Sequence, residues 1–264
     1  MTFDSTETVS ELNARITDAV RQAGPADLYI MPELLGAGPT YDPAVPPTDR
    51  PLSDDGVQQL HGHLATLAEE KDAIVVGGSY PATGPEDGIY NRCPIATPED
   101  VLTYDKRNPI PEEREYGTRS GDAEPPLIRH KGVTVAPLVC YDVEFPELVR
   151  SVVDRGAEIL AVPSWTGSTA GAERVRRCAA ARAVENQCYV AQVPLVTEQG
   201  ADPSGTGRSV VFAPCDDVCG SGGTRLTLPL DQQVSAACPV DVDELRRSRT
   251  HASVGPYTDY RSGM

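Results

Sequence analysis

Helical spacing and short apolar runs alternate along the first part of the chain. Apolar side chains recur every three or four positions in 9–23 and again in 55–70, which predicts two amphipathic helices. An apolar run follows each of them, at 28–33 and at 73–79, and predicts a short buried strand. Between these pairs, 34–51 is rich in Gly and Pro and is expected to be a loop.

The middle and later parts of the chain contain further apolar runs that predict strands. The runs 89–96 and 101–106 are separated by a turn and predict an antiparallel pair, whereas 107–125 is rich in Pro and charge and predicts a loop. The run 132–142 predicts a fully buried strand, and a helix is expected at 146–156. Beyond it, the pattern predicts strands at 158–164, 188–196, 208–214, 224–230 and 234–240, and helices at 171–187 and from Asp241.

This order of elements predicts an α/β protein in which helices flank layered sheets. Some neighbouring strands are joined through helices and others by turns, so parallel and antiparallel pairs are both expected. The chain has 264 residues, of which 39% are hydrophobic, and it contains neither an internal repeat nor a linker. A single domain spanning residues 1–264 is therefore expected.

The charge balance argues against two classes of partner. Asp and Glu number 39 and Lys and Arg number 23, which gives a formal charge of −16. At long range this charge repels phosphate backbones and anionic lipid surfaces, so neither nucleic acid nor membrane is expected as a partner. The sequence also lacks a basic and apolar leader and an apolar run of about eighteen residues. These features predict a cytoplasmic protein.

The seven cysteines, an odd number, indicate free thiols rather than a disulfide framework. No Cys-x-x-Cys pair occurs, and Cys215 and Cys219, the nearest approach to metal spacing, have no His or second pair close by. We therefore expect no metal and no other cofactor. The six cysteines other than Cys140 are interpreted as buried or half-exposed thiols without a chemical role.

Cys140 differs from the other cysteines in its position. It lies near the C-terminal end of the predicted strand 132–142 and shortly before the helix expected from Pro146. Side chains at the C-terminal ends of strands in α/β sheets face the crevice in which ligands bind, and a helix N-terminus favours negative charge. Both effects are expected to favour a thiolate, so Cys140 is a candidate nucleophile.

A nucleophilic cysteine requires a proton acceptor and a positive neighbour. None of the four histidines has a suitable position in the predicted elements, but Glu33, Lys106 and Cys140 each fall at the end of a predicted strand. Strand ends of this kind can meet in one crevice. There Glu33 could take the thiol proton, and Lys106 could stabilise first the thiolate and then the oxyanion of a tetrahedral intermediate. The set predicts acyl transfer without histidine.

The segments that contain these three residues resemble motifs of the nitrilase superfamily, the carbon–nitrogen hydrolases. MPELL contains Glu33, YDKRN contains Lys106 and CYDVEFPELVR contains Cys140, in the order that the family has. GAEILAVPSW, AARAVENQCYV and GTGRSVVFAP resemble later family segments, so the resemblance runs from about Ala26 to Pro214. It implies a four-layer αββα sandwich that commonly forms a homodimer or a higher homo-oligomer.

The resemblance also implies roles for single residues. Glu33 takes the role of general base, Lys106 that of oxyanion stabiliser and Cys140 that of nucleophile, and the backbone N–H of Tyr141 is a second oxyanion donor. Trp165, the only tryptophan, follows a predicted strand end, so its ring is expected either to wall the substrate pocket or to pack in the core.

The chain departs from the family pattern in two places. The family has a further glutamate after the lysine, but here the segment IPEEREYGTRSG is compressed. Matching from both flanks favours Glu113, with Glu112 and Glu115 as alternatives. Family members also open with a strand before the first helix, and this sequence runs from MTF almost directly into the helix. Either a core strand is missing or another element fills its place.

The combined features predict an amidase that hydrolyses a small linear carboxamide through a cysteine thioester and releases ammonia or an amine. The sequence Cys-Tyr-Asp from Cys140 resembles the amidase-like and carbamoylase-like branches more than true nitrilases, whose cysteine is typically followed by Trp-Glu. An N-carbamoyl-amide hydrolase is the alternative enzyme. A catalytically silent relative that serves as a binding or scaffold subunit is the alternative from another class, because of the two departures.

Overall fold

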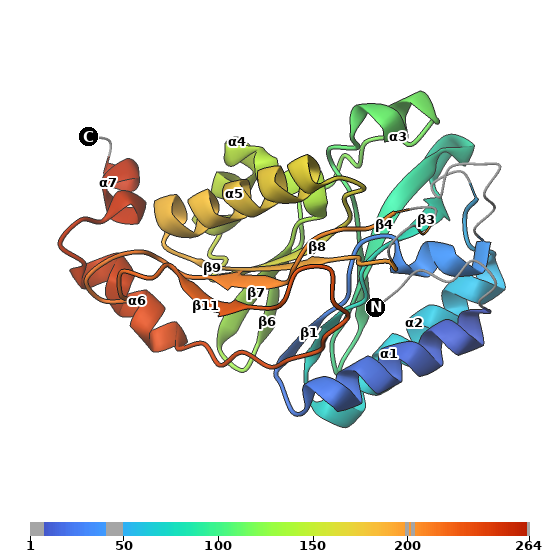
Figure 1. The fold of residues 1–264 in the computed structure, drawn as a ribbon, viewed down its shortest axis with the longest axis horizontal. Coiled ribbons are helices and arrows are strands. Elements are labelled where there is room, and N and C mark those ends of the chain that lie inside the picture. The colour runs from blue at the N-terminus through green and yellow to red at the C-terminus, as the bar shows by residue number, and fades with distance from the viewer. Residues whose placement is uncertain (1–7, 41–49, 199–200, 202–203, 263–264) are drawn as a thin grey trace.

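Two β-sheets lie face to face between two pairs of helices (Figure 1). The computed structural model describes residues 8–40, 50–198, 201 and 204–262. In the first sheet β1 pairs with β2, and β2 and β3 pair with successive parts of one edge of β4. β5 pairs along the other edge of β4. The strands of this sheet are β1 (Leu28–Ile30), β2 (Ile74–Val76), β3 (Tyr80–Thr83), β4 (Ile89–Ala96) and β5 (Val101–Asp105).

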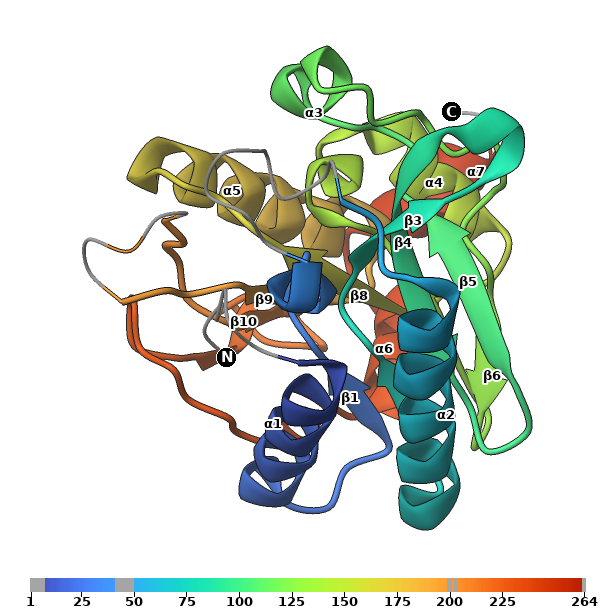
Figure 2. The same cartoon turned by 90° about the vertical axis from the view of Figure 1, so that its right-hand side faces the viewer.

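Two amphipathic helices, α1 (Val9–Ala23) and α2 (Asp54–Lys71), cover the outer face of the first sheet, as predicted. Thr8 and Glu11 cap the first turn of α1 reciprocally, and the Ser53 side chain caps α2. Figure 2 shows the two helices side by side. Their apolar faces pack on the sheet through Leu12, Ile16, Val20, Leu60, Leu64 and Leu67, which meet Tyr29, Met31 and Val75.

The second sheet has the strand order β11-β10-β9-β8-β7-β6. Its central strands β7, β8 and β9 are parallel, and the outer pairings are antiparallel. Parallel neighbours require crossover connections, which the helices after β7 and β8 provide. The strands are β6 (Ile128–His130), β7 (Val133–Pro137), β8 (Ile159–Ser164), β9 (Tyr189–Pro194), β10 (Val210–Phe212) and β11 (Thr224–Thr227).

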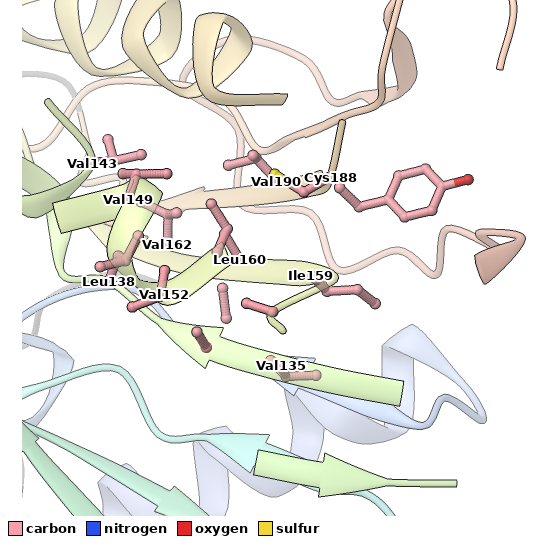
Figure 3. Close-up of a cluster of buried hydrophobic side chains, with 14 of the residues drawn as sticks. Val135, Leu138, Val143, Val149, Val152, Ile159, Leu160, Val162, Cys188 and Val190 are labelled. Carbon is pink, nitrogen blue, oxygen red and sulfur yellow. The ribbon is translucent and has the colours of Figure 1, made fainter. Parts of the chain in front are cut away.

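The crossover helices α4 (Pro146–Asp154) and α5 (Thr169–Asn186) cover the outer face of the second sheet (Figure 1). Two further helices, α6 (Val242–His251) and α7 (Pro256–Ser262), follow the last strand. Apolar residues of α4 pack directly on the central strands. Figure 3 shows this contact, with the labelled side chains Val149 and Val152 from α4 and Leu160 and Val162 from β8.

The inner faces of the two sheets pack against each other and form the central core. In β2, Ile74 and Val76 belong to the cluster that contains the second sheet, whereas Val75 belongs to the cluster under α1 and α2. Successive side chains of a strand point to opposite faces, so this short strand joins two cores. The predicted four-layer αββα sandwich is confirmed.

Several predicted strands are shorter than expected, among them 188–196, 208–214 and 224–230, which form β9, β10 and β11. In three others a left-handed backbone conformation lies beyond the observed end of the strand, with φ of +53° at Leu34, +74° at Gly78 and +47° at Cys140. An extended strand cannot include such a residue, so the chain leaves the sheet before it is reached. The strands expected at 28–33, 73–79 and 132–142 therefore end at Ile30, Val76 and Pro137.

Two predicted loops contain short helices. Within 107–125, α3 (Pro111–Glu115) forms with Pro111 at its first position, where the missing N–H of proline costs nothing. Within 34–51, residues Leu35–Thr40 form the 3₁₀ helix η1, and residues 41–49 lie outside the described part of the chain. The expectation of irregular structure was therefore wrong at both places, and α3 matters for the site.

A cavity of about 620 Å³ lies beside β1 and is bordered by α1, β9 and β10. The segment 234–240 also borders it and forms no strand, contrary to expectation; Pro239 has no backbone N–H for a ladder. Among the described strands, β1 pairs only with β2. The expectation of a missing opening strand concerns residues 1–7, which lie outside the described part of the chain.

Candidate active site

Cys140 lies at a sharp bend between β7 and α4. It is the first residue of the 3₁₀ helix η3 (Cys140–Glu144), and its φ of +47° is one that residues other than glycine rarely adopt. The side chain is 4% exposed, and its Sγ lies 3.5 Å from the carbonyl oxygen of Trp165. Glu33 and Lys106 both lie close enough to the thiol to shift its pKa.

Glu33, Lys106 and Glu113 form a buried ion-pair group beside this thiol. The Lys106 Nζ lies 2.7 Å from Glu33 Oε1 and 2.8 Å from Glu113 Oε2. Glu33 lies in the loop after β1, Lys106 follows β5 directly and Glu113 lies in α3, so segments far apart in the sequence meet here. An ammonium has three N–H groups, and the described partners of Lys106 use two of them.

The side chain of Asn91 in β4 hydrogen-bonds to both glutamates. Its Nδ2 donates to Glu33 Oε1 and to Glu113 Oε1, each at 3.0 Å. Its backbone carbonyl accepts from the Lys106 N–H at 2.8 Å, which continues the ladder between β4 and β5. Glu113 receives a third donor from the backbone N–H of Ile110, at 2.7 Å from Oε2. The carboxylates are therefore held from several directions.

A fully buried carboxylate, Asp142, connects the segment that follows Lys106 to the bend at Cys140. Asp142 comes two residues after Cys140, and its partner Asn108 comes two residues after Lys106. A buried carboxylate is tolerated where donors satisfy its oxygens. Asp142 accepts four hydrogen bonds, from the Tyr104 hydroxyl (2.9 Å), the Asn108 backbone N–H (2.8 Å), Asn108 Nδ2 (3.0 Å) and the Val139 backbone N–H (3.2 Å).

We expect Asp142→Ala to lower kcat about 100-fold and the free energy of unfolding by about 2–4 kcal/mol. The change leaves buried donors unpaired and removes the contact between the segment after Lys106 and the bend at Cys140. Initial rates and urea unfolding measure the two effects. Tyr104→Phe removes one of the four donors and is the milder control, expected to cost about 1 kcal/mol. Parent-like rates and stability in Asp142→Ala would refute this structural role of Asp142.

The pKa values of the two glutamates shift in opposite directions. Burial raises the pKa of Glu33, although Lys106 acts against it. For Glu113 burial acts in the same upward direction, but Lys106, Asn91 and the backbone N–H of Ile110 outweigh it and lower the pKa. Two carboxyl groups with separated pKa values can divide the work of proton transfer and charge stabilisation. Glu33 is the better proton acceptor, and Glu113 stays anionic.

The surroundings of Cys140 favour the protonated thiol. Burial and the negative charge of Glu33 raise its pKa well above the ordinary range, although Lys106 acts in the opposite direction. The upward direction is opposite to the one expected from the sequence, because burial outweighs the positive neighbours. Burial likewise disfavours the ammonium of Lys106, but Glu113 and Glu33 outweigh it and raise the pKa of Lys106. A neutral thiol thus lies beside a charged lysine and a buried carboxylate.

The other candidate residues take more peripheral positions. Tyr141 is partly buried and packs edge to face on Phe145, with ring centroids 4.9 Å apart. Trp165 packs at the margin of the core under α1 and α2, and its Nε1 donates to the Ser204 carbonyl at 2.9 Å. Its backbone carbonyl, rather than its ring, has the recorded contact with Cys140.

Glu113 is distinguished from its two alternatives by burial. It is 6% exposed and contacts Lys106, whereas Glu112 and Glu115 on the same short helix are exposed to solvent. Because neighbouring residues of a helix point about 100° apart, only one side of α3 can face the site. The compressed segment therefore still delivers one carboxylate to the lysine.

Two residues of the site were missed in the sequence. Asn91 was read only as part of a strand, although asparagine is depleted in strands and a buried one requires partners. Asp142 was given no role in the site, whereas it is an internal acceptor of four donors. Its place directly after an apolar run, two residues beyond the cysteine, was the available signal.

Other groups contribute no second centre within the described residues. There, no cluster of three or more His, Cys, Asp and Glu side chains is arranged to hold a metal ion. All seven cysteines are free thiols. His61 contacts the Tyr80 hydroxyl and His63 the Thr17 hydroxyl. None of the described helices combines the length and the apolar character needed to cross a membrane.

Known proteins match this chain along most of its length. The sequence profile of a family described as carbon–nitrogen hydrolase matches residues 1–219. The probable hydrolase YhcX of Bacillus subtilis is 32% identical over 204 residues, which are 74% of this chain but only 39% of that protein. An (R)-stereoselective amidase of a Pseudomonas species is 29% identical over 264 residues, which cover 97% of this chain and 92% of that protein.

A solved structure agrees with the fold over the whole chain. It is a mutant of the amidase from Nesterenkonia sp. AN1, with the acetamide moiety of fluoroacetamide added covalently at its active-site cysteine. The TM-score is 0.71 at 26% identity, and the match covers 100% of this chain and 94% of the other. The resemblance to the nitrilase superfamily is thereby confirmed, and the chain belongs to the carbon–nitrogen hydrolase family.

Proposed function

We propose that this protein is an amidase that hydrolyses a small carboxamide through a thioester at Cys140. One observation carries the proposal: the Lys106 ammonium contacts Glu33 and Glu113 at 2.7 and 2.8 Å beside a buried thiol. The combination supplies a nucleophile, a proton acceptor and a fixed positive charge. The amidase names of the Pseudomonas and Nesterenkonia relatives support the same reaction class.

In the first half of the reaction, the Cys140 Sγ attacks the amide carbon while Glu33 takes the thiol proton. The C–S bond forms, and the carbonyl electrons move to the oxygen. The free N–H of Lys106 and the backbone N–H of Tyr141 stabilise this oxyanion. Glu33 then gives its proton to the amide nitrogen, the C–N bond breaks, and ammonia or an amine leaves a thioester.

In the second half, water attacks the thioester carbon while Glu33 takes one water proton. The C–S bond of the tetrahedral intermediate breaks and the carboxylic acid leaves. The sulfur of Cys140 recovers a proton from Glu33, which restores the resting thiol. Glu113 keeps its negative charge throughout and holds the Lys106 ammonium in place, in agreement with its three donors.

The silent-subunit alternative loses one of its two motivations. It rested on the compressed glutamate segment and on the missing opening strand, yet Glu113 of α3 contacts Lys106. An N-carbamoyl-amide hydrolase uses the same chemistry, and no feature of the described site favours it over a plain carboxamide. The seven free thiols favour action in a reducing compartment such as the cytoplasm, and the family resemblance favours a homodimer.

Intact-mass spectrometry under turnover tests the proposal. The protein is mixed with small carboxamides, N-carbamoyl amino acids and nitriles, and ammonia release is recorded in parallel. We expect ammonia release with carboxamides and a mass gain equal to the acyl group, located on Cys140 by peptide mapping. Turnover of nitriles alone, or an acyl group on another residue, contradicts the proposal.

A further inference from the structure

We propose that Asn91 is a positioning residue that fixes which oxygen of Glu33 is available to the Cys140 thiol. The inference rests on the proposed function, because it assigns the orientation of the proposed base. Asn91 is 1% exposed and lies in the interior of β4. Its role follows from how the donors around Glu33 are distributed.

Both donors to Glu33 converge on one carboxylate oxygen. The Lys106 ammonium lies 2.7 Å from Glu33 Oε1 and Asn91 Nδ2 lies 3.0 Å from the same atom. Among the described residues, the Cys140 thiol is the one further side chain that hydrogen-bonds to Glu33, and neither Lys106 nor Asn91 contacts Oε2. Two donors from different directions prevent the carboxylate from rotating, so Oε2 remains the oxygen that can accept a proton from Cys140.

The same amide holds the second glutamate. Its other Nδ2 proton goes to Glu113 Oε1, while Lys106 and the Ile110 backbone N–H both lie on Glu113 Oε2. One NH₂ group therefore sets the spacing between two carboxylates of like charge, and Lys106 also bridges them, through the same oxygen of Glu33 and the other oxygen of Glu113. Without Asn91, repulsion between Glu33 and Glu113 would be opposed by the lysine alone.

The carbonyl oxygen of Asn91 strengthens this assignment. Asn91 Oδ1 is buried and has no hydrogen-bond partner among the described residues. A buried acceptor without a donor is unfavourable, and a reversed amide would correct many such cases. Here reversal would place Oδ1 at 3.0 Å from two carboxylate oxygens and remove both donors. The Asn91 Oδ1 atom therefore stays unpaired because the Nδ2 group hydrogen-bonds to both glutamates.

The position of Asn91 also couples it to the lysine. Its carbonyl accepts from the Lys106 N–H, so the two residues are neighbours across β4 and β5. Side chains at such neighbouring positions lie on one face of the sheet. The ionisable groups in contact with Asn91 are Glu33, Glu113 and Lys106. Cys140, Cys93 and Asp142 interact electrostatically with members of this set.

Asn91→Leu tests the proposal, since leucine has the same branching at Cγ and no donor. Two pH profiles are measured: kcat/KM on an accepted amide, and the rate of Cys140 alkylation by iodoacetamide. A hydrogen bond to a carboxylate favours its charged form, so its loss should raise the carboxyl pKa values. We expect the acid limb of both profiles to move up by about one pH unit. We expect kcat to fall about 10- to 100-fold with KM nearly unchanged.

Two further variants separate this role from simple structural support. Asn91→Ser restores one donor and is expected to recover part of the shift, which also serves if Asn91→Leu folds poorly. Asn186→Ala removes a buried asparagine of α5, whose side chain donates to the Arg182 carbonyl and to Glu185, and is expected to leave both limbs in place. Unmoved limbs in both Asn91 variants overturn the proposal. If the parent hydrolyses no amide, the proposed function fails, but the alkylation profile still decides the role of Asn91.

Discussion

Cys140→Ala should abolish amide turnover, with a loss of at least about 10,000-fold in kcat. The variant removes the only atom that can form the acyl-enzyme in the proposed reaction, so no residual covalent route remains. The change deletes one sulfur from a buried site and leaves the Glu33, Lys106 and Glu113 group intact. Cooperative unfolding close to that of the parent is therefore expected. Steady-state ammonia release and intact mass after substrate addition measure the loss.

Cys188→Ala is the matched control for this experiment. Cys188 is also fully buried, and burial raises the pKa of its thiol to about 12. It lies directly before β9, in the core cluster of the second sheet, and its Sγ contacts the Arg182 carbonyl. We expect a stability loss of about 1 kcal/mol and unchanged kcat. Turnover by Cys140→Ala, or equal losses in both variants, would exclude Cys140 as the nucleophile.

The sequence was sufficient for most elements because the apolar periodicity is strong where a helix covers a sheet. It failed where backbone sterics decide the outcome, as at the ends of the strands before Leu34 and Cys140, whose positive φ values have no compositional signal. It also failed for α3, because a helix of five residues is stabilised by its place in the site rather than by periodicity. Local pattern predicts what is repeated along the chain, and long-range contacts decide the rest.

The candidate site shows the same division. Glu33, Lys106 and Cys140 could be selected because each lies at a predicted strand end, and the structure brings all three segments together. The protonation state could not be obtained in this way, because it depends on how deeply the thiol is buried. Asn91 was missed for a related reason. Its function lies in bridging two glutamates that are 58 and 22 residues away in the chain.

Lys106→Met should produce the second large effect, a loss of both activity and stability at neutral pH. Methionine fills similar space but leaves Glu33 and Glu113 without the ammonium that lies 2.7 and 2.8 Å from them. Removing one partner of a buried ion pair typically costs about 3–5 kcal/mol, because a buried charge is left uncompensated. We expect kcat to fall about 1,000-fold or more, since the oxyanion donor is lost as well. Urea unfolding and initial rates at pH 7 measure both losses.

The pH dependence of stability in this variant distinguishes loss of the buried ion-pair group from loss of side-chain packing. In the parent, the lowered pKa of Glu113 contributes stability that is present above the carboxyl's unfolded pKa and lost as the pH falls. Without Lys106, burial and mutual repulsion should raise both carboxyl pKa values above those of the unfolded chain. Stability is then greatest at low pH and is lost as the pH rises through the raised values, so Lys106→Met should recover stability relative to the parent on acidification from pH 7 to pH 5.

Lys131→Met provides the matched control, because Lys131 also contacts two carboxylates, Asp27 and Asp72, but on the surface. Exposed pairs of this kind contribute little, since water and salt screen them. We expect unchanged activity and a stability profile parallel to that of the parent at every pH. If Lys106→Met also runs parallel to the parent from pH 7 to pH 5, the two glutamates are not held against each other by the lysine. The physical basis of the proposed site, one ammonium that keeps two buried carboxylates apart and oriented, would then be wrong.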